Sequence, residues 1–207
     1  ESRGLGDVYK RQTGDNNVAI GVNALGVLTT ADNNVAVGTS AGDAITTGGA
    51  IVVIGSNAGG QLTSDQYVTA VGYNAGAYAE AGNGNRYNSY FGSDAGYRGG
   101  PGVSQTYLGA SSGLYATGSY NTFVGTSAGQ GGTTSAPYSS GASNTAVGAY
   151  ALDAFTTGYN NTALGRGAGT AVTTGFGNVY IGYNSGYYAT TGRGNVAIGA
   201  STQQGAS

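Results

Sequence analysis

The sequence predicts an all-β fold, a parallel β-solenoid of about eleven 17-residue rungs with two short strands each. A short apolar run closed by glycine recurs along the chain at nearly constant spacing. Glycine supplies 42 of the 207 residues and proline only 2, a composition that does not fit collagen. Aliphatic residues keep a fixed phase to each closing glycine, which a disordered glycine-rich linker does not require.

The closing glycine defines the repeat. Successive closing glycines are 17, 17, 17, 20, 17, 16, 23, 17, 17 and 17 residues apart, so the unit has 17 residues and two turns carry insertions. One such coil cannot bury its own apolar residues, so the coils must stack, and at about 4.8 Å each they form a rod of roughly 50 Å. The closing glycines are Gly21, Gly38, Gly55, Gly72, Gly92, Gly109, Gly125, Gly148, Gly165, Gly182 and Gly199.

Each closing glycine ends a predicted strand with a period of two. The residue before the glycine is always apolar, and two residues earlier stands Val, Thr or Ser. Because alternate side chains of a strand project to the same side, we expect these two positions to face the core. The residue between them is small or aromatic and never charged, and we expect it to face away from the core and to be covered by other chains.

Asparagine opens eight of the eleven predicted strands. If the rungs stack in register, these amides can bond along the rod as a structural ladder. The alternative is that asparagine caps each turn locally, since it tolerates left-handed backbone. The ladder residues would be Asn17, Asn34, Asn88, Asn121, Asn144, Asn161, Asn178 and Asn195.

Two corners interrupt each repeat. A small residue, usually alanine, stands three positions after the closing glycine, where glycine and alanine allow a tight bend. A second turn follows in many units, as in the Thr-Thr-Gly sequences that end at Gly48, Gly158 and Gly175. Two corners in each unit predict two short strands.

The composition argues against several functions. The chain has no Cys and no His, which removes disulfides and the usual general base, and we predict no enzyme, no cofactor and no metal site. Only 8% of residues are charged and the net charge is −2, so we expect no nucleic acid partner. No apolar run approaches the roughly 20 residues of a membrane span, so we expect no membrane insertion by this segment. The acidic residues, among them Asp65, Glu80 and Asp153, lie mostly in predicted turns and are expected to be solvated.

The N-terminal residues differ from the repeats. Residues 2–12, SRGLGDVYKRQ, resemble the translation of a sequencing adapter. We therefore treat residues 1–12 as a non-native leader and residues 13–207 as one β-roll repeat domain, a fragment of a longer chain. A genuine basic N-terminal arm is the alternative.

The insertions are the candidate ligand-contact loops. Extra residues must leave the coil as loops, and loops on a rigid scaffold commonly make contacts. Tyrosine and arginine are favoured in binding hot spots, and exposed aromatic rings suit sugars. The alternative is that the insertions are merely tolerated. The candidate residues are Arg86, Tyr87, Pro137 and Tyr138 in the two insertions, and Tyr97 and Arg98 in a further predicted loop between them.

The units NNVAIGVNAL, NNVAVGTSAG, NTFVGTSAG, NTALGRGAG and GNVAIGAS resemble the head repeats of the YadA-like trimeric autotransporter adhesins, and similar repeats occur in bacteriophage tail fibres. The resemblance spans residues 16–201. It implies a left-handed parallel β-roll, a homotrimer about a threefold axis and a role in attachment. The chain departs from the family in its longer, 17-residue rung and its many tyrosines.

We therefore expect a structural or adhesive head or fibre segment that attaches to a host cell, a matrix or a surface ligand, with a host surface protein or glycan as receptor. It would be extracellular, on a bacterial cell surface with its outer-membrane anchor in a missing C-terminal part, or it would form a tail-fibre shaft or tip on a virion.

An ice-binding β-solenoid would need a regular threonine array. Thr122, Thr145 and Thr162 recur in phase, but we expect them to point inward.

Overall fold

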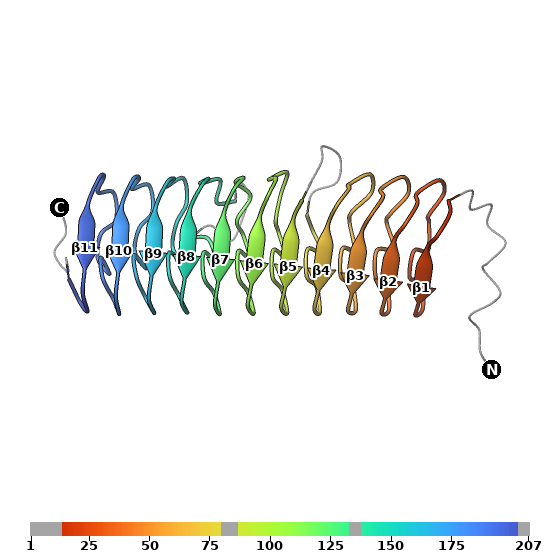
Figure 1. The fold of residues 1–207 in the computed structure, drawn as a ribbon, viewed down its shortest axis with the longest axis horizontal. Helices are drawn as coiled ribbons and strands as arrows, with labels where there is room; N and C mark the ends of the chain where they lie inside the picture. Colours follow the sequence, from red (N-terminus) through yellow and green to blue (C-terminus); the bar gives the residue numbers. More distant parts are fainter. Residues whose placement is uncertain (1–13, 80–86, 133–137, 203–207) are drawn as a thin grey trace.

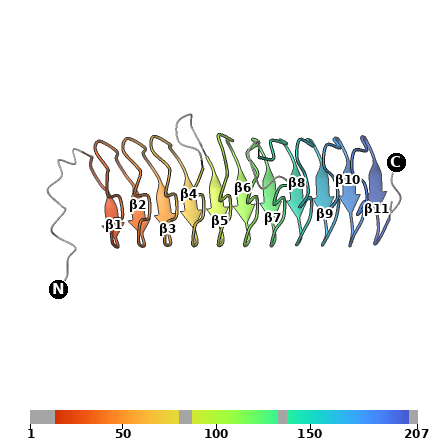
Figure 2. The same cartoon turned by 180° about the vertical axis from the view of Figure 1, so that it is seen from behind.

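The chain folds into one rod of stacked turns (Figure 1). The computed structural model describes residues 14–79, 87–132 and 138–202. The strands lie side by side in sequence order along the long axis, and Figures 1 and 2 show the chain entering at one end of the rod and leaving at the other. These residues form strands and turns without a helix, and so contain no helix that could cross a membrane. The predicted all-β parallel solenoid is confirmed.

The eleven strands form a single parallel sheet in which each strand pairs with the strands of the turns before and after it. The register is constant from strand to strand: residues 17 apart pair directly in most turns, as Ala36 does with Val53, and residues 16 apart pair between β6 and β7. The insertions leave this register intact, because Val71 pairs with Phe91 and Phe123 pairs with Ala146. The strands are β1 (Val18–Ile20), β2 (Val35–Val37), β3 (Val52–Ile54), β4 (Thr69–Val71), β5 (Ser89–Phe91), β6 (Thr106–Leu108), β7 (Thr122–Val124), β8 (Thr145–Val147), β9 (Thr162–Leu164), β10 (Val179–Ile181) and β11 (Val196–Ile198).

Each described turn has one regular strand, and the expected second strand is absent. The return segment, by which we mean the residues between one strand and the next, pairs with its neighbours only through isolated bridges such as Gly49 with Gln66. Its backbone repeatedly adopts positive φ, as at Ser40, Gly42 and Ala50, and these positions prevent an extended run. The return segments still bond from turn to turn, since the amide of Thr46 donates to the carbonyl of Thr63 at 2.9 Å.

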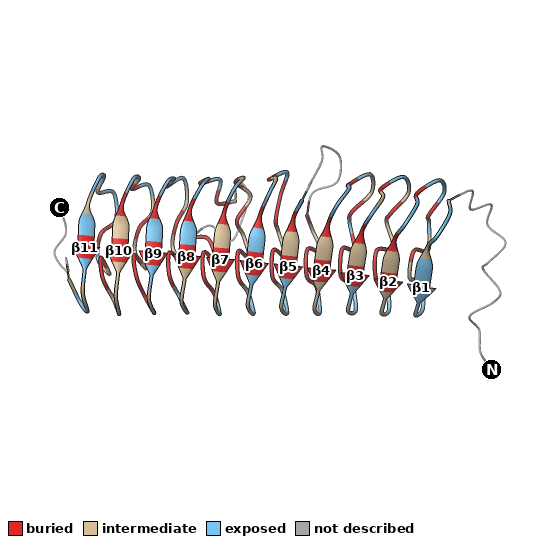
Figure 3. Cartoon of the chain, viewed as in Figure 1, coloured by how far each residue is buried: buried red, intermediate tan, exposed pale blue. Residues whose placement is uncertain are grey.

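The residues of each strand that face the core are not the ones expected. The middle residue of each strand from β2 to β11 is buried, whereas the residues before and after it are exposed or half-buried (Figure 3). Tyr107 has no exposed surface, and its neighbour Leu108 is 50% exposed. The prediction that the aliphatic positions face inward is therefore wrong, because a period of two fits either phase equally well.

In most turns the core is filled by pairs of complementary volume, although Ala70 and Ala79 of one turn are both small. In most turns the residue seven positions after the closing glycine is a buried apolar residue of the return segment and belongs to the same core cluster as the middle residues of the strands. Glycine takes this place at positions 99 and 132. A small strand residue goes with a large return residue, as Ala36 does with Ile45, and a large strand residue goes with a small one, as Tyr107 does with Ala116. The same exchange relates Ala146 to Phe155, Ala163 to Val172 and Tyr180 to Ala189.

Aromatic rings occupy the middle of the core. The ring of Tyr107 lies between those of Tyr90 and Phe123, with centroids 5.4 Å and 5.1 Å away. Phe123 meets Phe155 from a return segment at 5.5 Å in an edge-on arrangement. Burial raises the pKa of the Tyr107 phenol well above its usual range, so this ring is neutral at all ordinary pH values.

The asparagine side chains bond along the rod. The backbone amide and the Nδ2 of Asn161 both donate to Oδ1 of Asn144, at 3.0 and 3.1 Å. The same Nδ2 also donates to the carbonyl of Gly175 at the corner, so each amide links two turns and fixes a bend. The left-handed conformation belongs to the residue before the ladder position, such as Asn160 with φ 54°, and not to the ladder residue itself. Equivalent bonds join Asn17 to Asn34, Asn121 to Asn144, Asn161 to Asn178 and Asn178 to Asn195.

Replacing Asn161 by alanine is expected to lower the free energy of unfolding by about 2–4 kcal/mol. The change leaves the buried amide of Asn178 and the carbonyl of Gly175 without their bonds to this side chain. Urea unfolding followed by circular dichroism measures the loss. Asn195→Ala, at the last described strand, should cost less than half as much, and equal losses in the two variants would contradict a cooperative ladder.

Candidate functional site

Exposed apolar side chains gather on one face of the sheet, which we call the outer sheet face. It consists of the first and third residues of β1 to β11, which are exposed or half-buried, whereas the middle residue is buried in β2 to β11 (Figure 3). The third position is aliphatic or aromatic in every strand, and Leu164 and Ile198 are 47% and 65% exposed. An apolar strip therefore runs the whole length of the rod.

A row of threonines runs along this face, parallel to the long axis of the rod. Thr106, Thr122, Thr145 and Thr162 are the first residues of four consecutive strands and pair in direct register. Each is exposed or half-buried, so the expectation that this position points inward is wrong. Serine or valine and one further threonine take the same position in the other strands, so the row is regular only over β6 to β9.

A cluster of aromatic rings around one cation lies on the return segments. The guanidinium carbon of Arg98 stands 4.5 Å from the ring centroid of Tyr78, 5.4 Å from that of Tyr97 and 5.7 Å from that of Tyr138. The rings of Tyr78 and Tyr97 meet edge-on at 4.8 Å, and Tyr115 stacks on Tyr138 at 6.0 Å with an angle of 13°. We call these five residues the tyrosine–arginine cluster.

The regular spacing of the turns assembles this cluster. Its members come from four consecutive return segments, which stack through backbone hydrogen bonds. The amide of Tyr78 donates to the carbonyl of Tyr97, that of Arg98 to Leu114 and that of Tyr115 to Gln130, each at 2.8 Å. Residues at the same place in successive turns are thereby held about 4.8 Å apart, which is a stacking distance for rings.

All five side chains of the cluster are half-buried. Burial raises the pKa of the Tyr97 phenol, and its hydrogen bond with Tyr78 acts in the same direction. The positive charge of Arg98 opposes these effects. Arg98 is the only acidic or basic residue among the five, and its guanidinium is always protonated, so the cluster carries a positive charge.

The structure brings three of the six candidate contact residues together. Tyr97, Arg98 and Tyr138 belong to the cluster, whereas Arg86 and Pro137 lie outside the described residues.

Sequence reasoning missed the other two rings. Tyr78 and Tyr115 each stand six residues after a closing glycine, as Arg98 does, and aligning the repeats at that offset would have revealed the column. Tyr78 and Tyr115 were not predicted because the search for contact residues concentrated on the insertions, and neither residue lies in one.

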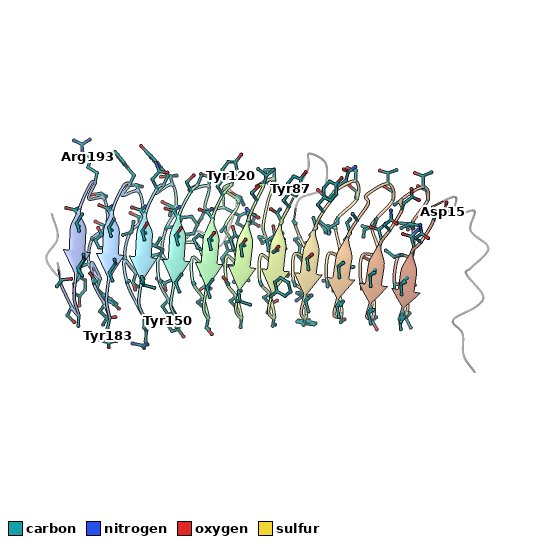
Figure 4. All side chains as sticks on the ribbon, viewed as in Figure 1. Asp15, Tyr87, Tyr120, Tyr150, Tyr183 and Arg193 are labelled. Carbon is teal, nitrogen blue, oxygen red and sulfur yellow. The ribbon has the colours of Figure 1, made fainter. Side chains whose placement is uncertain are left out.

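Tyr87, the remaining candidate, lies elsewhere. Figure 4 shows it with Tyr120 on one long edge of the rod, while Tyr150 lies on the opposite edge. Its ring stacks on that of Tyr67, with centroids 5.1 Å apart and an angle of 4° between the planes. Tyr67 borders a shallow polar hollow that Gln66 also lines.

No family model, curated protein or solved structure matches the chain. The geometry of the rod and its surfaces therefore carries the functional argument.

Two acidic residues differ from the expectation that all are solvated. Asp65 is fully buried, and Asp153 is half-buried with an Oδ1 that meets no hydrogen-bond donor in the described part of the chain. Glu80 lies outside the described residues. Over those same described ranges, acidic side chains do not gather in groups of three or more that could hold a metal ion.

Asp153 should make the stability of the rod depend on pH. Burial raises the pKa of its carboxyl to about 6, against roughly 3.9 in an unfolded chain. A carboxyl whose pKa is raised by folding stabilises the fold below its unfolded pKa, and this contribution is lost as the pH rises through the folded value. We expect the loss between about pH 4 and pH 7 to be ~1 kcal/mol, since solvent screens a half-exposed group.

Thermal unfolding of the chain and of Asp153→Asn over this pH range measures the effect. The variant should be the more stable of the two at neutral pH and should lack this part of the pH dependence. Parallel pH profiles would show that Asp153 is not the titrating group.

Proposed function

We propose that the chain is a structural and adhesive segment of an extracellular attachment rod, in which three copies pack through their outer sheet faces. The observation that carries the proposal is the apolar strip of the outer sheet face, which accompanies the whole solenoid. Surfaces of this kind are typical of interfaces, because soluble monomers rarely expose apolar patches beyond a few hundred Å².

The size of the strip supports burial against other chains. Eleven strands about 4.8 Å apart, each about 10 Å long, span a face of roughly 500 Å² before side chains are counted. Phe91, Leu108 and Leu164, from the middle of the rod, are at least 39% exposed on it. Packing of three such strips about one axis would form a second apolar core between the chains, in agreement with the homotrimer that the resemblance implies.

The remaining surfaces suit contact with a receptor. The return segments carry the tyrosine–arginine cluster and would face outward in such a trimer. We propose a host surface protein or glycan as the receptor and an attachment role without catalysis. The segment would belong to a bacterial surface adhesin, or to a bacteriophage tail-fibre shaft or tip, for which the same rod would serve.

Light scattering on the folded chain tests the assembly. We expect a species of about three times the 20.2 kDa chain mass, with β structure by circular dichroism. Leu108→Lys combined with Leu164→Lys should give a folded monomer, because two charges per chain would have to be buried in the shared core.

The matched control places two lysines elsewhere. Thr157→Lys with Thr174→Lys changes exposed positions on the return segments and should leave the trimer intact. A folded monomer of the unchanged chain would overturn the proposed assembly.

An ice-binding solenoid is the second candidate function. The observation that favours it is the outward row from Thr106 to Thr162, which lies in register on the parallel sheet. It requires the outer sheet face to be free, so it applies only if the chain is a monomer. Thermal hysteresis of the folded monomer, absent from a Thr122→Lys variant, would support this function over attachment.

A further inference from the structure

We propose that the tyrosine–arginine cluster binds a carboxylate-bearing saccharide, with the guanidinium of Arg98 as the anchor. This inference deepens the proposed attachment function and rests on it in one respect only, that the cluster faces outward from the proposed trimer. It begins from a half-buried cation that is surrounded by three rings.

The described residues offer Arg98 no carboxylate partner. Asp94, four residues earlier, already accepts hydrogen bonds from Nδ2 of Asn74 at 3.0 Å and from Oγ of Ser93 at 2.9 Å. Asp153 belongs to a return segment three turns further along, about 14 Å away at the spacing of the strands. The rings stabilise the charge only in part, because a cation–π contact is weaker than a full ion pair.

The geometry of the guanidinium leaves its donors available. Contacts between a guanidinium and ring faces engage its flat surfaces, whereas its five N–H groups point outward in its plane. Within the described ranges, none of the hydrogen bonds involves the guanidinium of Arg98. A planar carboxylate fits two of these donors side by side, and one guanidinium balances its single negative charge.

The rings suit the rest of a sugar. Tyr115 and Tyr138 are nearly parallel, and Tyr78 meets Tyr97 edge-on, so rings from turns before and after that of Arg98 lie close to its guanidinium. Aromatic faces pack on the C–H face of a saccharide, and neutral phenols exchange hydrogen bonds with its hydroxyls. A bare anion would use the arginine alone, so the rings favour an acidic sugar.

The site stays accessible in the proposed trimer. All five residues come from return segments, and the outer sheet face that would join the chains is made only of strand residues. Three copies about one axis would present three such sites, which raises the strength of binding to a glycan-covered surface without any new contact.

Titration of the full chain with sialyllactose, trigalacturonic acid and lactose tests the proposal by calorimetry or chemical-shift change. We expect binding of at least one carboxylated probe near or below about 1 mM, and binding of neutral lactose at least about tenfold weaker. Arg98→Lys keeps the charge but loses the paired donors, and it should weaken binding by at least about tenfold.

Arg166→Lys is the matched control. Arg166 also lies over a tyrosine, Tyr183, at 5.7 Å, but within the described part of the chain it meets that single ring, so its replacement should leave the titration unchanged. Melting temperatures of both variants separate binding from packing. A lower melting temperature for Arg98→Lys with unchanged binding would assign the cluster a packing role, and failure of both carboxylated probes to bind would overturn the proposal.

The oligomeric state separates this inference from the proposed assembly. A trimer that binds neither carboxylated probe would overturn the acidic-sugar site and leave the attachment rod in place. A monomer that binds sialyllactose through Arg98 would overturn the trimer and leave the site in place.

Discussion

Replacing Gly109 by alanine is expected to destabilise the rod by ~3–5 kcal/mol and to disrupt its middle turns. Gly109 has a φ of +136°, which side chains disfavour strongly, and a Cβ on it would lie 2.6 Å from the carbonyl carbon of Gly125. The backbone of each closing glycine contacts that of the next, so the carbonyl can retreat only by moving the following turn. Thermal unfolding followed by circular dichroism measures the loss.

Gly194→Ala is the matched control. Gly194 also has a positive φ, +65°, but a Cβ on it would meet nothing within 4 Å. The change should cost about 1 kcal/mol, the usual cost of alanine in left-handed backbone. Gly194→Asn should cost still less, since Asn33 and Asn160 hold the same place in their turns with φ near +60°. Similar losses for Gly109→Ala and Gly194→Ala would contradict the role of backbone stacking.

The architecture of this rod was predictable because its repeats fix the register. The spacing of Gly92, Gly109 and Gly125 predicts stacked turns, and the strands end one residue before these glycines. Handedness and the number of chains in the assembly follow from no such pattern, and the left-handed coil and the trimer stay predictions. The distance between stacked turns along the rod could be predicted because each turn repeats one local conformation.

The orientation of the strands was not predictable from the period alone. The aliphatic row that ends in Leu108 looks like a core, and the middle row varies between Ala36 and Tyr107. That variation is compensated by residues nine positions later, Ile45 and Ala116, which lie in the return segment. A pair of positions with opposite volumes identifies a core better than one constant position, because packing constrains the sum of the two volumes.

The candidate site was predictable in part. Arg98 and Tyr97 were expected because tyrosine and arginine favour binding surfaces, but the expectation treated each loop separately. The solenoid instead places them beside Tyr78 and Tyr115 from the neighbouring turns. Contacts between turns depend on the offset within the repeat and not on the distance along the chain.

The compensation of core volumes leads to a second prediction of large effect. Tyr107→Ala is expected to cost about 3–5 kcal/mol, because it removes a fully buried ring that stacks on Tyr90 and Phe123. Ala116→Leu alone should cost about 1–3 kcal/mol, since the Tyr107 ring already fills the space opposite Ala116. Urea unfolding of the two variants measures both losses.

The double variant Tyr107→Ala with Ala116→Leu should be more stable than Tyr107→Ala alone, although Ala116→Leu destabilises the unchanged chain. The exchange gives this turn the volumes of the turn that contains Ala36 and Ile45, where a small strand residue goes with a large return residue. We expect a coupling of roughly 2–3 kcal/mol in the double-mutant cycle, the range for residues that share one cavity. Strictly additive losses would mean that the two positions do not share a volume, and the core would then be set by each row separately. A large coupling would show that Tyr107 and Ala116 share one volume in this turn of the core.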